Sequence, residues 1–311
     1  MDAISVRHLV KRYGDREVVH DVSFTGRQGE TVAVLGANGA GKTTTVEILE
    51  GFRDRTAGEV TVLGTDPRDG GPHWRAQLGI VLQSTGLDAE LTVAETLAFY
   101  GSLYRKPRPY AEVMESVGLT EQAKVRLGQL SGGQLRRVDL GVGIIGRPRV
   151  LFLDEPTTGF DPAARRQAWA IIEALRAEGT TVLLTTHYLE EAQRLADRVV
   201  VIADGRVVAD DTPDGIAEHV GLRTEVTFRL GAAVQRSDLT GPLSGAEVDG
   251  EQATIRTAEV TRVVGALTDL ARSRSAELAG LSVTPASFEE VYLRLTTHPA
   301  KENGETEVSH V

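Results

Sequence analysis

The stretch VLGANGAGKTTTVEILEG, residues 34–51, places a glycine-rich loop between an apolar run and a segment of helical character. Glycine loses more conformational entropy on folding than any other residue, so such a loop must serve a shape that other residues cannot adopt. The spacing is Gly36, four residues, Gly41, Lys42 and Thr43. This is the pattern of a phosphate-binding loop (P-loop), and the flanking segments TVAVLG and TTTVEILEG predict the strand and the helix that it requires.

Each residue type in this loop has a chemical reason. Glycines let successive backbone N–H groups curl into a cradle for phosphate oxygens, and the following helix directs its positive dipole end to the same anion. Lys42 adds a mobile positive charge near the β- and γ-phosphates, and the Thr43 hydroxyl can ligate Mg²⁺. The structural alternative is an ordinary glycine-rich turn. We expect ATP to bind through Gly36, Asn38, Gly39, Ala40, Gly41, Lys42, Thr43 and Thr44.

Composition narrows the classes of protein to consider. The chain has 311 residues, 41% hydrophobic and 25% charged, which is typical of one large or two ordinary globular domains. A net charge of −10 argues against a dedicated nucleic-acid binder, so we expect no nucleic-acid partner. The absence of cysteine excludes disulfides, thiol catalysis and Cys-based metal sites. No secretory signal and no membrane-spanning run is visible, so we expect a cytoplasmic protein that reaches a membrane only through a partner.

Apolar and helical segments alternate along the first two-thirds of the chain. Strands rich in Val, Leu and Ile that alternate with helices are typical of a parallel sheet covered on both faces, so we expect an α/β P-loop NTPase core. The expected helices include ARRQAWAIIEALRAEG and LEEAQRLADR. The expected strands are AISVRHLV, REVVHDVSF, ETVAVLG, GEVTVLG, RVLFLDEP, TTVLLTTH and VVVIADGRVV, each interpreted as one strand.

The domain boundaries follow from changes in the pattern of apolar residues along the chain. Residues 84–148 have a helical pattern and predict a helical subdomain within a nucleotide-binding domain of residues 1–218. Residues 219–296 predict a small α+β C-terminal domain, and the polar residues 297–311 a disordered tail.

The C-terminal domain is expected to contain two strands, TEVTFRL and EQATIRT, and two helices. The first helix is EVTRVVGALTDLARSR, and the second lies in SFEEVYLRLT, where Ser287 and Glu290 could form a capping box. Its apolar side chains at helical spacing favour a core face over a docking surface; they are Phe288, Val291, Tyr292 and Leu295.

A second anion-binding device begins at residue 130 with LSGGQLRRV. Ser131, Gly132 and Gly133 precede a helix, which again aims free N–H groups at an anion, with Gln134 completing the motif. One nucleotide has no obvious need for two such helix N-termini far apart in sequence. Either the chain has two anion sites, or the second device serves the nucleotide of another subunit.

The P-loop and LSGGQ together make the chain resemble the nucleotide-binding subunit of ATP-binding-cassette (ABC) transporters, over residues 2–218. The resemblance implies an ABC ATPase fold and a head-to-tail dimer, in which each ATP lies between the P-loop of one subunit and the LSGGQ of the other. It implies a separate transmembrane permease as partner and a location at the cytoplasmic face of the membrane. The sequence leaves open whether the dimer is homomeric or heteromeric.

RVLFLDEP ends an apolar strand in two carboxylates. Asp154, at the strand end, suits a direct or indirect contact with Mg²⁺, and Glu155 would then lie beside the γ-phosphate and polarise the attacking water. Two solvated acids at a strand end are the structural alternative, which the P-loop disfavours.

Further site residues are expected from the resemblance. His187 matches the histidine that contacts the γ-phosphate, and Gln83 matches the glutamine that senses nucleotide, ligates Mg²⁺ and borders the permease groove. Tyr13 matches the aromatic that stacks on adenine, and Asp161 the acid of a loop that crosses the dimer interface. Phe160 departs from the usual leucine. A structural, solvated or packing role is the alternative for His187, Gln83 and Tyr13.

LTVAETLAFYGSLYRKP and SVTPASFEEVYLRLT resemble the drug-exporter branch typified by daunorubicin-resistance ATPases. This resemblance favours efflux of a drug, an antibiotic or another hydrophobic compound. The alternatives are an importer motor with a regulatory C-terminal domain and a soluble ABC ATPase of DNA repair or translation. Importers usually carry a longer extension, and the soluble relatives carry coiled-coil insertions, zinc cysteines or two cassettes.

Overall fold

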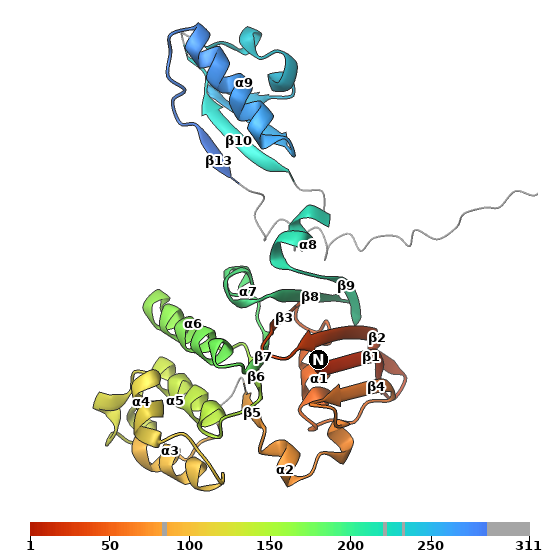
Figure 1. The fold of residues 1–311 in the computed structure, drawn as a ribbon, viewed down its shortest axis with the longest axis vertical. Helices are drawn as coiled ribbons and strands as arrows, with labels where there is room; N and C mark the ends of the chain where they lie inside the picture. Colours follow the sequence, from red (N-terminus) through yellow and green to blue (C-terminus); the bar gives the residue numbers. More distant parts are fainter. Residues whose placement is uncertain (83–85, 220–222, 232–233, 285–311) are drawn as a thin grey trace, which may run out of the picture. The chain divides into compact units, whose positions relative to one another are not determined.

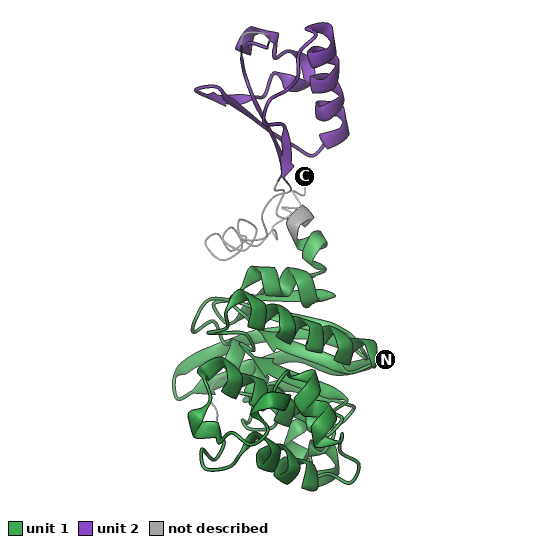
Figure 2. Ribbon diagram, turned by 90° about the vertical axis from the view of Figure 1, so that its left-hand side faces the viewer, with its two compact units in different colours: residues 1–216, 295–311 green, residues 217–294 purple. Residues whose placement is uncertain are grey.

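The computed structural model describes residues 1–82, 86–219, 223–231 and 234–284. The chain divides into two compact units, Met1–Ile216 and Ala217–Arg294, which Figure 2 colours green and purple. Gln83, the helix predicted at 287–296 and the tail predicted at 297–311 lie outside the described residues. Among the residues that are described, no helix is long and apolar enough to cross a membrane.

A six-stranded sheet forms the centre of the first unit, in the order β5-β6-β7-β3-β8-β9. The first five strands are parallel, and their apolar residues are almost wholly buried, as the Val- and Leu-rich runs predict. The bounds are β3 Thr31–Leu35, β5 Leu78–Val81, β6 Val150–Asp154, β7 Thr181–Thr185, β8 Arg198–Ala203 and β9 Arg206–Asp211.

The prediction of one strand over VVVIADGRVV was wrong. Asp204 and Gly205 have positive φ values of 47° and 74°, and they turn the chain so that β9 returns antiparallel to β8. Asp-Gly is a strongly favoured pair for a two-residue hairpin turn, because both residues tolerate the left-handed region.

An antiparallel sheet of order β2-β1-β4 packs against this centre (Figure 1). Side chains of both sheets share one core, with Ile4 and Phe24 in the same cluster as Val34 and Phe152. The strands are β1 Asp2–Tyr13, β2 Arg16–Arg27 and β4 Ala57–Val62. The helices beside the two sheets are α1 Lys42–Leu49, α2 Pro72–Arg75, α6 Pro162–Ala177 and α7 Leu189–Leu195, with a 3₁₀ turn at Pro67–Asp69. Helix α8, Pro213–His219, follows β9 and spans the boundary between the two units.

Three helices form the insertion between β5 and β6: α3 Val93–Ser102, α4 Tyr110–Ser116 and α5 Gly132–Ile145. Thr92 and Glu95 form a capping box that fixes the start of α3. Gly141 lets α5 approach α3 and α4 closely, since a Cβ there would meet Leu97 at 3.1 Å and Val113 at 3.3 Å. Short 3₁₀ turns at Thr120–Gln122 and Leu127–Gln129 lead from α4 to α5.

Within residues 223–231 and 234–284, the second unit has an antiparallel sheet of order β11-β12-β10-β13 and one long helix. Along α9, Val260–Ser273, buried Val263 and Leu267 recur at helical spacing and share a core with Val226, Phe228 and Ile255 of the sheet. The strands are β10 Thr224–Arg229, β11 Glu247–Asp249, β12 Gln252–Thr257 and β13 Ser282–Thr284, with 3₁₀ turns at Arg236–Asp238 and Gly241–Leu243.

Candidate active site

A pocket of about 300 Å³ opens where the glycine-rich loop meets the end of strand β6. The loop brings backbone N–H groups and the Lys42 ammonium, and the strand end brings two carboxylates, so phosphate-binding and metal-binding groups share one cavity. The lining residues are Val18, Asn38, Gly39, Gly41, Lys42, Thr43, Thr44, Asp154 and Glu155.

The glycines of this loop are required by their surroundings. A Cβ on Gly36 would lie 2.3 Å from the carbonyl oxygen of Ile202. Gly41 has φ +100°, and a Cβ there would lie 2.9 Å from the carbonyl oxygen of Val18. Gly41 is the N-cap of α1 and provides no side-chain cap, so the first N–H groups of the helix are left for an anion.

Lys42 lies at the centre of the loop and is 7% exposed. Its Nζ donates to the carbonyl oxygens of Gly36, at 2.7 Å, and Ala37, at 3.1 Å. Burial lowers the pKa of Lys42, while the charges of Glu155 and Asp154 act in the opposite direction. The ammonium is thus held by loop carbonyls on a flexible stem, from which it can reach a phosphate that enters the pocket.

The two carboxylates after β6 have different environments. Asp154 accepts a hydrogen bond from the Thr185 hydroxyl of β7, which fixes its carboxylate at the strand end. Glu155 has a left-handed backbone with φ +48°, and its N–H donates to the Thr185 carbonyl oxygen at 3.1 Å. Its Oε2 accepts from the Thr158 hydroxyl at 3.2 Å.

His187 lies next to Glu155, with 3.3 Å between its Nδ1 and Glu155 Oε1. The imidazole stacks on Tyr188 with 4.1 Å between ring centroids, and the Arg165 guanidinium lies over the same Tyr188 ring at 4.5 Å. The histidine ring therefore lies between an acid that lines the pocket, Glu155, and an aromatic neighbour, Tyr188.

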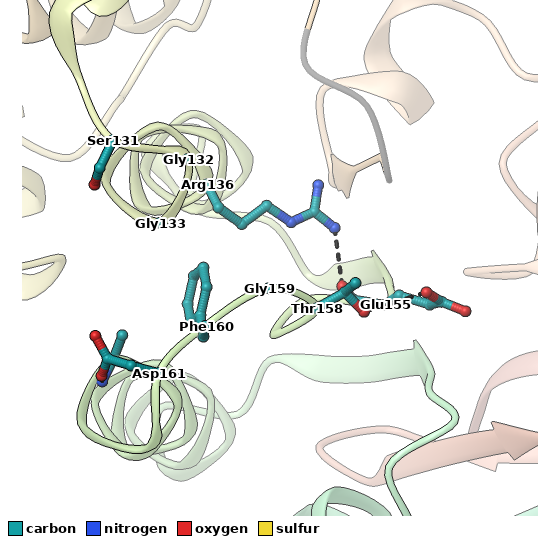
Figure 3. A pocket seen from close by; sticks show the side chains of 10 residues that line it. Ser131, Gly132, Gly133, Arg136, Glu155, Thr158, Gly159, Phe160 and Asp161 are labelled. Carbon is teal, nitrogen blue, oxygen red and sulfur yellow. Dashed lines mark hydrogen bonds between the residues drawn. The ribbon is translucent and has the colours of Figure 1, made fainter.

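The LSGGQ segment forms the N-terminus of α5 and lines a second pocket, of about 580 Å³ (Figure 3). Ser131 and Gln134 form a reciprocal capping box, in which the Gln134 N–H donates to Ser131 Oγ at 3.3 Å and the Ser131 N–H to Gln134 Oε1 at 2.9 Å. Gly132 has no atom within 4 Å of a Cβ added to it. This end of α5 faces open space.

The loop after Glu155 completes this second pocket. Phe160 is buried, and a Cβ on Gly133 would lie 3.9 Å from its ring, so the larger aromatic packs against the signature segment. Asp161 is the N-cap of α6 and accepts from Ala163 N and Ala164 N at 2.9 and 2.8 Å, which lowers its pKa. Asp161 thus has a structural role within the single chain.

Comparison with known proteins gives the family. Residues 19–158 match the ABC transporter family, and residues 224–287 match the C-terminal domain of ABC transporter domain-containing protein-like chains. The chain is 40% identical over 311 residues to a daunorubicin resistance ATP-binding protein of Streptomyces coeruleorubidus, covering 96% of this chain and 97% of that protein. The chain belongs to the ABC transporter ATP-binding proteins.

Other relatives agree with this membership. A Nod factor export ATP-binding protein I of Burkholderia lata is 36% identical over 301 residues, covering 94% of this chain and 96% of that protein. A solved ABC transporter cassette described as dimeric superimposes with a TM-score of 0.61 at 25% identity, covering 67% of this chain and 98% of that one. The protein is accordingly an ABC ATPase, the subunit of a transporter that binds and hydrolyses ATP.

Several residues predicted for the site of this ABC ATPase do not line the first pocket. His187 contacts Glu155 at 3.3 Å without lining the pocket itself, and Ser131, Gly132, Gly133 and Asp161 line the second pocket. Tyr13 lies at the tip of the hairpin between β1 and β2, 41% exposed, with Lys11 Nζ 4.9 Å and the Arg53 guanidinium 5.3 Å from its ring centre. Gln83 lies outside the described residues.

Several residues around the site were not predicted from the sequence, among them Thr185, which holds Asp154. Val18 lines the first pocket from β2, and Thr158 donates to the Glu155 carboxylate. Arg136 lines the LSGGQ pocket and reaches back to β6. Only Arg136 carried a local signal, because it follows Gly132 and Gly133 at the i+4 and i+3 spacing of one helix face.

Proposed function

We propose that this ABC ATPase is the motor of an exporter, and that it binds Mg²⁺-ATP in the first pocket and hydrolyses it there. The observation that carries the proposal is the convergence of Lys42 and Thr43 with Asp154 and Glu155 in one cavity. Phosphoryl transfer needs little covalent help from a protein, so positioning and charge stabilisation by these groups can supply catalysis.

Nucleotide binding falls to the loop and its surroundings. The backbone N–H groups of residues 36–44 receive the phosphates, and Lys42 exchanges its loop carbonyls for phosphate oxygens. Tyr13 has an exposed ring on which adenine can stack. In the structure, the side chains of Lys11 and Arg53 lie over this ring.

Mg²⁺ fits the oxygen donors of this pocket. The Thr43 hydroxyl and the Asp154 carboxylate are hard ligands, and Thr185 holds Asp154 at the strand end. We propose these two residues, together with Gln83, as the holders of the ion. When bound, Mg²⁺ neutralises charge on the phosphate oxygens.

Glu155 is proposed to act on the water that attacks the γ-phosphate. Its carboxylate is oriented by Thr158 and by His187, so it can accept a hydrogen bond from that water while His187 lies close to the same phosphate. Hydrolysis then yields ADP and phosphate.

The LSGGQ end of α5 is proposed to serve the nucleotide of a second ATPase subunit in a head-to-tail dimer. Three observations support this assignment: Ser131 and Gln134 satisfy one another within the chain, Gly132 faces open space, and a solved relative is described as dimeric. Ser131, Gly132, Gly133 and Gln134, with Asp161, would then contact the partner or its nucleotide.

An exporter is favoured by the relatives, two of which are named for drug resistance and for export. We propose a separate transmembrane permease as partner, a location at the cytoplasmic face of the membrane, and a drug or another hydrophobic compound as cargo. The small C-terminal domain, residues 219–296, is proposed to be an accessory domain.

One capture experiment tests this function. Tagged Glu155→Gln chain is loaded with ATP to trap the complex, and membranes of the native host are extracted in mild detergent. Recovery of a multi-spanning membrane protein is the expected result, and its sequence narrows the cargo. Recovery of soluble or nucleic-acid-associated partners alone would contradict the exporter function.

A further inference from the structure

The backbone of Glu155 is in an unusual conformation for its residue type. Its φ of +48° lies in the left-handed region, which a residue with a Cβ adopts at a cost unless its surroundings impose it. Glu155 follows β6 directly, and this backbone turn decides where its carboxylate points. The contacts that hold this backbone conformation therefore also determine the direction of the Glu155 carboxylate.

Arg136 supplies several of these contacts from α5. Its Nη2 donates to the carbonyl oxygen of Glu155, at 3.1 Å, a hydrogen bond that Figure 3 marks with a dashed line. The same Nη2 donates to the carbonyl oxygen of Asp154, at 2.5 Å, and Nη1 donates to that of Leu82. The side chain is 8% exposed, and the guanidinium is close to the charges of Asp139, Asp154 and Glu155. The buried guanidinium of Arg136 thus connects α5 to the ends of β5 and β6, where the residues that it contacts, Leu82 and Asp154, are 72 positions apart in sequence.

We propose that Arg136 is a positioning residue for ATP hydrolysis, which holds Glu155 in its left-handed backbone and so aims its carboxylate at the attacking water. The inference rests on the proposed role of Glu155. It also links the two pockets, because Arg136 lies one turn after Gly132 on the helix whose N-terminus carries LSGGQ. A displacement of α5 is transmitted through this guanidinium to the backbone of the catalytic acid.

An arginine suits this role for a geometric reason. A guanidinium presents five N–H donors in a rigid plane, so it can hold several carbonyl oxygens in fixed relation, whereas a lysine presents a point charge on a flexible stem. Thr185 completes the arrangement from the other side, since it accepts the Glu155 N–H. Both the N–H and the C=O of the strained residue are therefore held.

The test compares Arg136→Met with Arg136→Lys in the purified full-length chain, using steady-state ATPase rates, equilibrium ATP binding and thermal unfolding. A misplaced reacting group can cost on the order of 10²-fold in rate, so we expect Arg136→Met to lower kcat by about 10- to 100-fold. ATP binding and KM should change by less than about threefold, because the phosphate cradle is untouched. Arg136→Lys should retain an intermediate kcat.

Arg108→Met is the matched control. Arg108 is likewise a mostly buried arginine of the helical insertion, and its guanidinium pairs with the carboxylate of Glu178 at the end of α6, but it lines neither of the two pockets. Its loss should lower the unfolding temperature while leaving kcat unchanged at temperatures where the chain is folded. If the control variant and Arg136→Met have the same unfolding temperature and lose kcat equally, the proposal is overturned.

A chemical rescue keeps the inference testable if Arg136→Met does not fold. Arg136→Ala removes the guanidinium, and added methylguanidinium at sub-denaturing concentration should restore part of the kcat of this variant. The same addition should not restore any kcat in Glu155→Gln. Failure of rescue, together with an unchanged kcat in Arg136→Lys, would contradict a positioning role. If Glu155→Gln loses turnover and Arg136→Ala keeps it, only the role of Arg136 is overturned. If Glu155→Gln keeps normal turnover, both the role of Glu155 in hydrolysis and this inference are overturned.

Discussion

Two helix N-termini in this protein look alike in sequence and differ in structure. Both α1 and α5 follow a glycine-containing loop, and both begin beside a pocket. The start of α1 has no side-chain cap, whereas the start of α5 is capped by its own Ser131 and Gln134. Glycine is needed at α1 because the chain itself crowds Gly36 and Gly41, and Gly132 at α5 meets nothing within 4 Å.

The difference indicates where each device finds its ligand. The chain closes around the α1 end and places Asp154, Glu155 and Lys42 there, so this site can do chemistry with its own residues. At α5 nothing in the described chain requires glycine at position 132, because a Cβ there would meet no atom within 4 Å, and the space beside it is open to a molecule from outside. A second copy of the ATPase, with its nucleotide, is the occupant that we propose.

Glu155→Gln should have the largest effect and tests the α1 side of the comparison. The amide keeps the shape of the side chain but cannot polarise water as a carboxylate does, so we expect kcat to fall by about 10²- to 10⁴-fold. ATP binding by the monomer should change by less than about twofold, since Lys42 and the loop N–H groups remain. Glu173→Gln, which alters a half-exposed ion pair with Arg194 on α6 and α7, is the control for charge. Turnover near the wild-type rate in Glu155→Gln would remove the acid from the mechanism.

Ser131→Arg tests the α5 side and should come next in size. A long cation in the open pocket blocks the approach of a second subunit, so turnover should fall by about 10²-fold or more while ATP affinity of the monomer is unchanged. A parallel drop in monomer affinity would mean that LSGGQ acts on the nucleotide of its own chain.

Mixing the two variants sharpens this test. In a head-to-tail dimer of one Ser131→Arg chain and one Glu155→Gln chain, one site combines intact Glu155 with an intact LSGGQ. The mixture should therefore recover part of the turnover that neither variant has alone. No recovery at any ratio, despite formation of mixed dimers, would contradict an interaction across subunits.

Gly36→Ala and Gly132→Ala compare the two glycines directly through stability. A Cβ at position 36 would lie 2.3 Å from the Ile202 carbonyl oxygen, so the free energy of unfolding should fall by about 1–3 kcal/mol or more. At position 132 the same change should leave it within about 0.5 kcal/mol, because surface changes without contacts are usually small. Equilibrium denaturation of both variants checks this expectation. Equal destabilisation would remove the contrast between the two loops.

Most of the first unit could be predicted from the sequence because strand, loop and helix each carried their own local signal. The P-loop glycines, the apolar strand before Asp154 and the serine before α5 all lie where the patterns predict. The error at Asp204 and Gly205 came from treating a valine-rich run as continuous, although Asp-Gly itself signals a hairpin.

Long-range contacts were the part that sequence patterns could not give. Arg136 is one of many arginines, and nothing in LSGGQLRRV says that its guanidinium reaches the carbonyls of Asp154 and Leu82. The left-handed backbone of Glu155 likewise has no local signal, because glutamate, unlike the aspartate of an Asp-Gly turn, has no local preference for that region. The residues that aim the acid therefore emerge from packing rather than from a motif.

The smallest expected effect concerns a buried acid on α5. Burial raises the pKa of Asp139 to about 7, while the charge of Arg136 acts in the opposite direction, and Asp139 Oδ2 has no hydrogen-bond partner among the described residues. The folded chain therefore holds a proton that the unfolded chain loses at an ordinary aspartate pKa, near 4. Between these two pKa values the unfolded state binds fewer protons, so the free energy of unfolding falls as pH rises from about 4 to about 7 and then levels off.

Asp139→Asn should remove this pH dependence and become more stable than the wild type above pH 7, with little difference near pH 4. Asp139 is half-buried, and the full shift would give ~4 kcal/mol, so after solvent screening is allowed for we expect roughly 1–2 kcal/mol. Denaturant titrations at pH 5 and pH 8.5 measure the difference.

Because Glu50, at the far end of α1, has a pKa raised to about 8 by burial and by the charges of Asp154 and Glu47, Glu50→Gln should change stability over a window that extends to higher pH. Identical pH profiles for the two variants would contradict the higher pKa of Glu50, and with it the difference between the buried acids of α1 and α5.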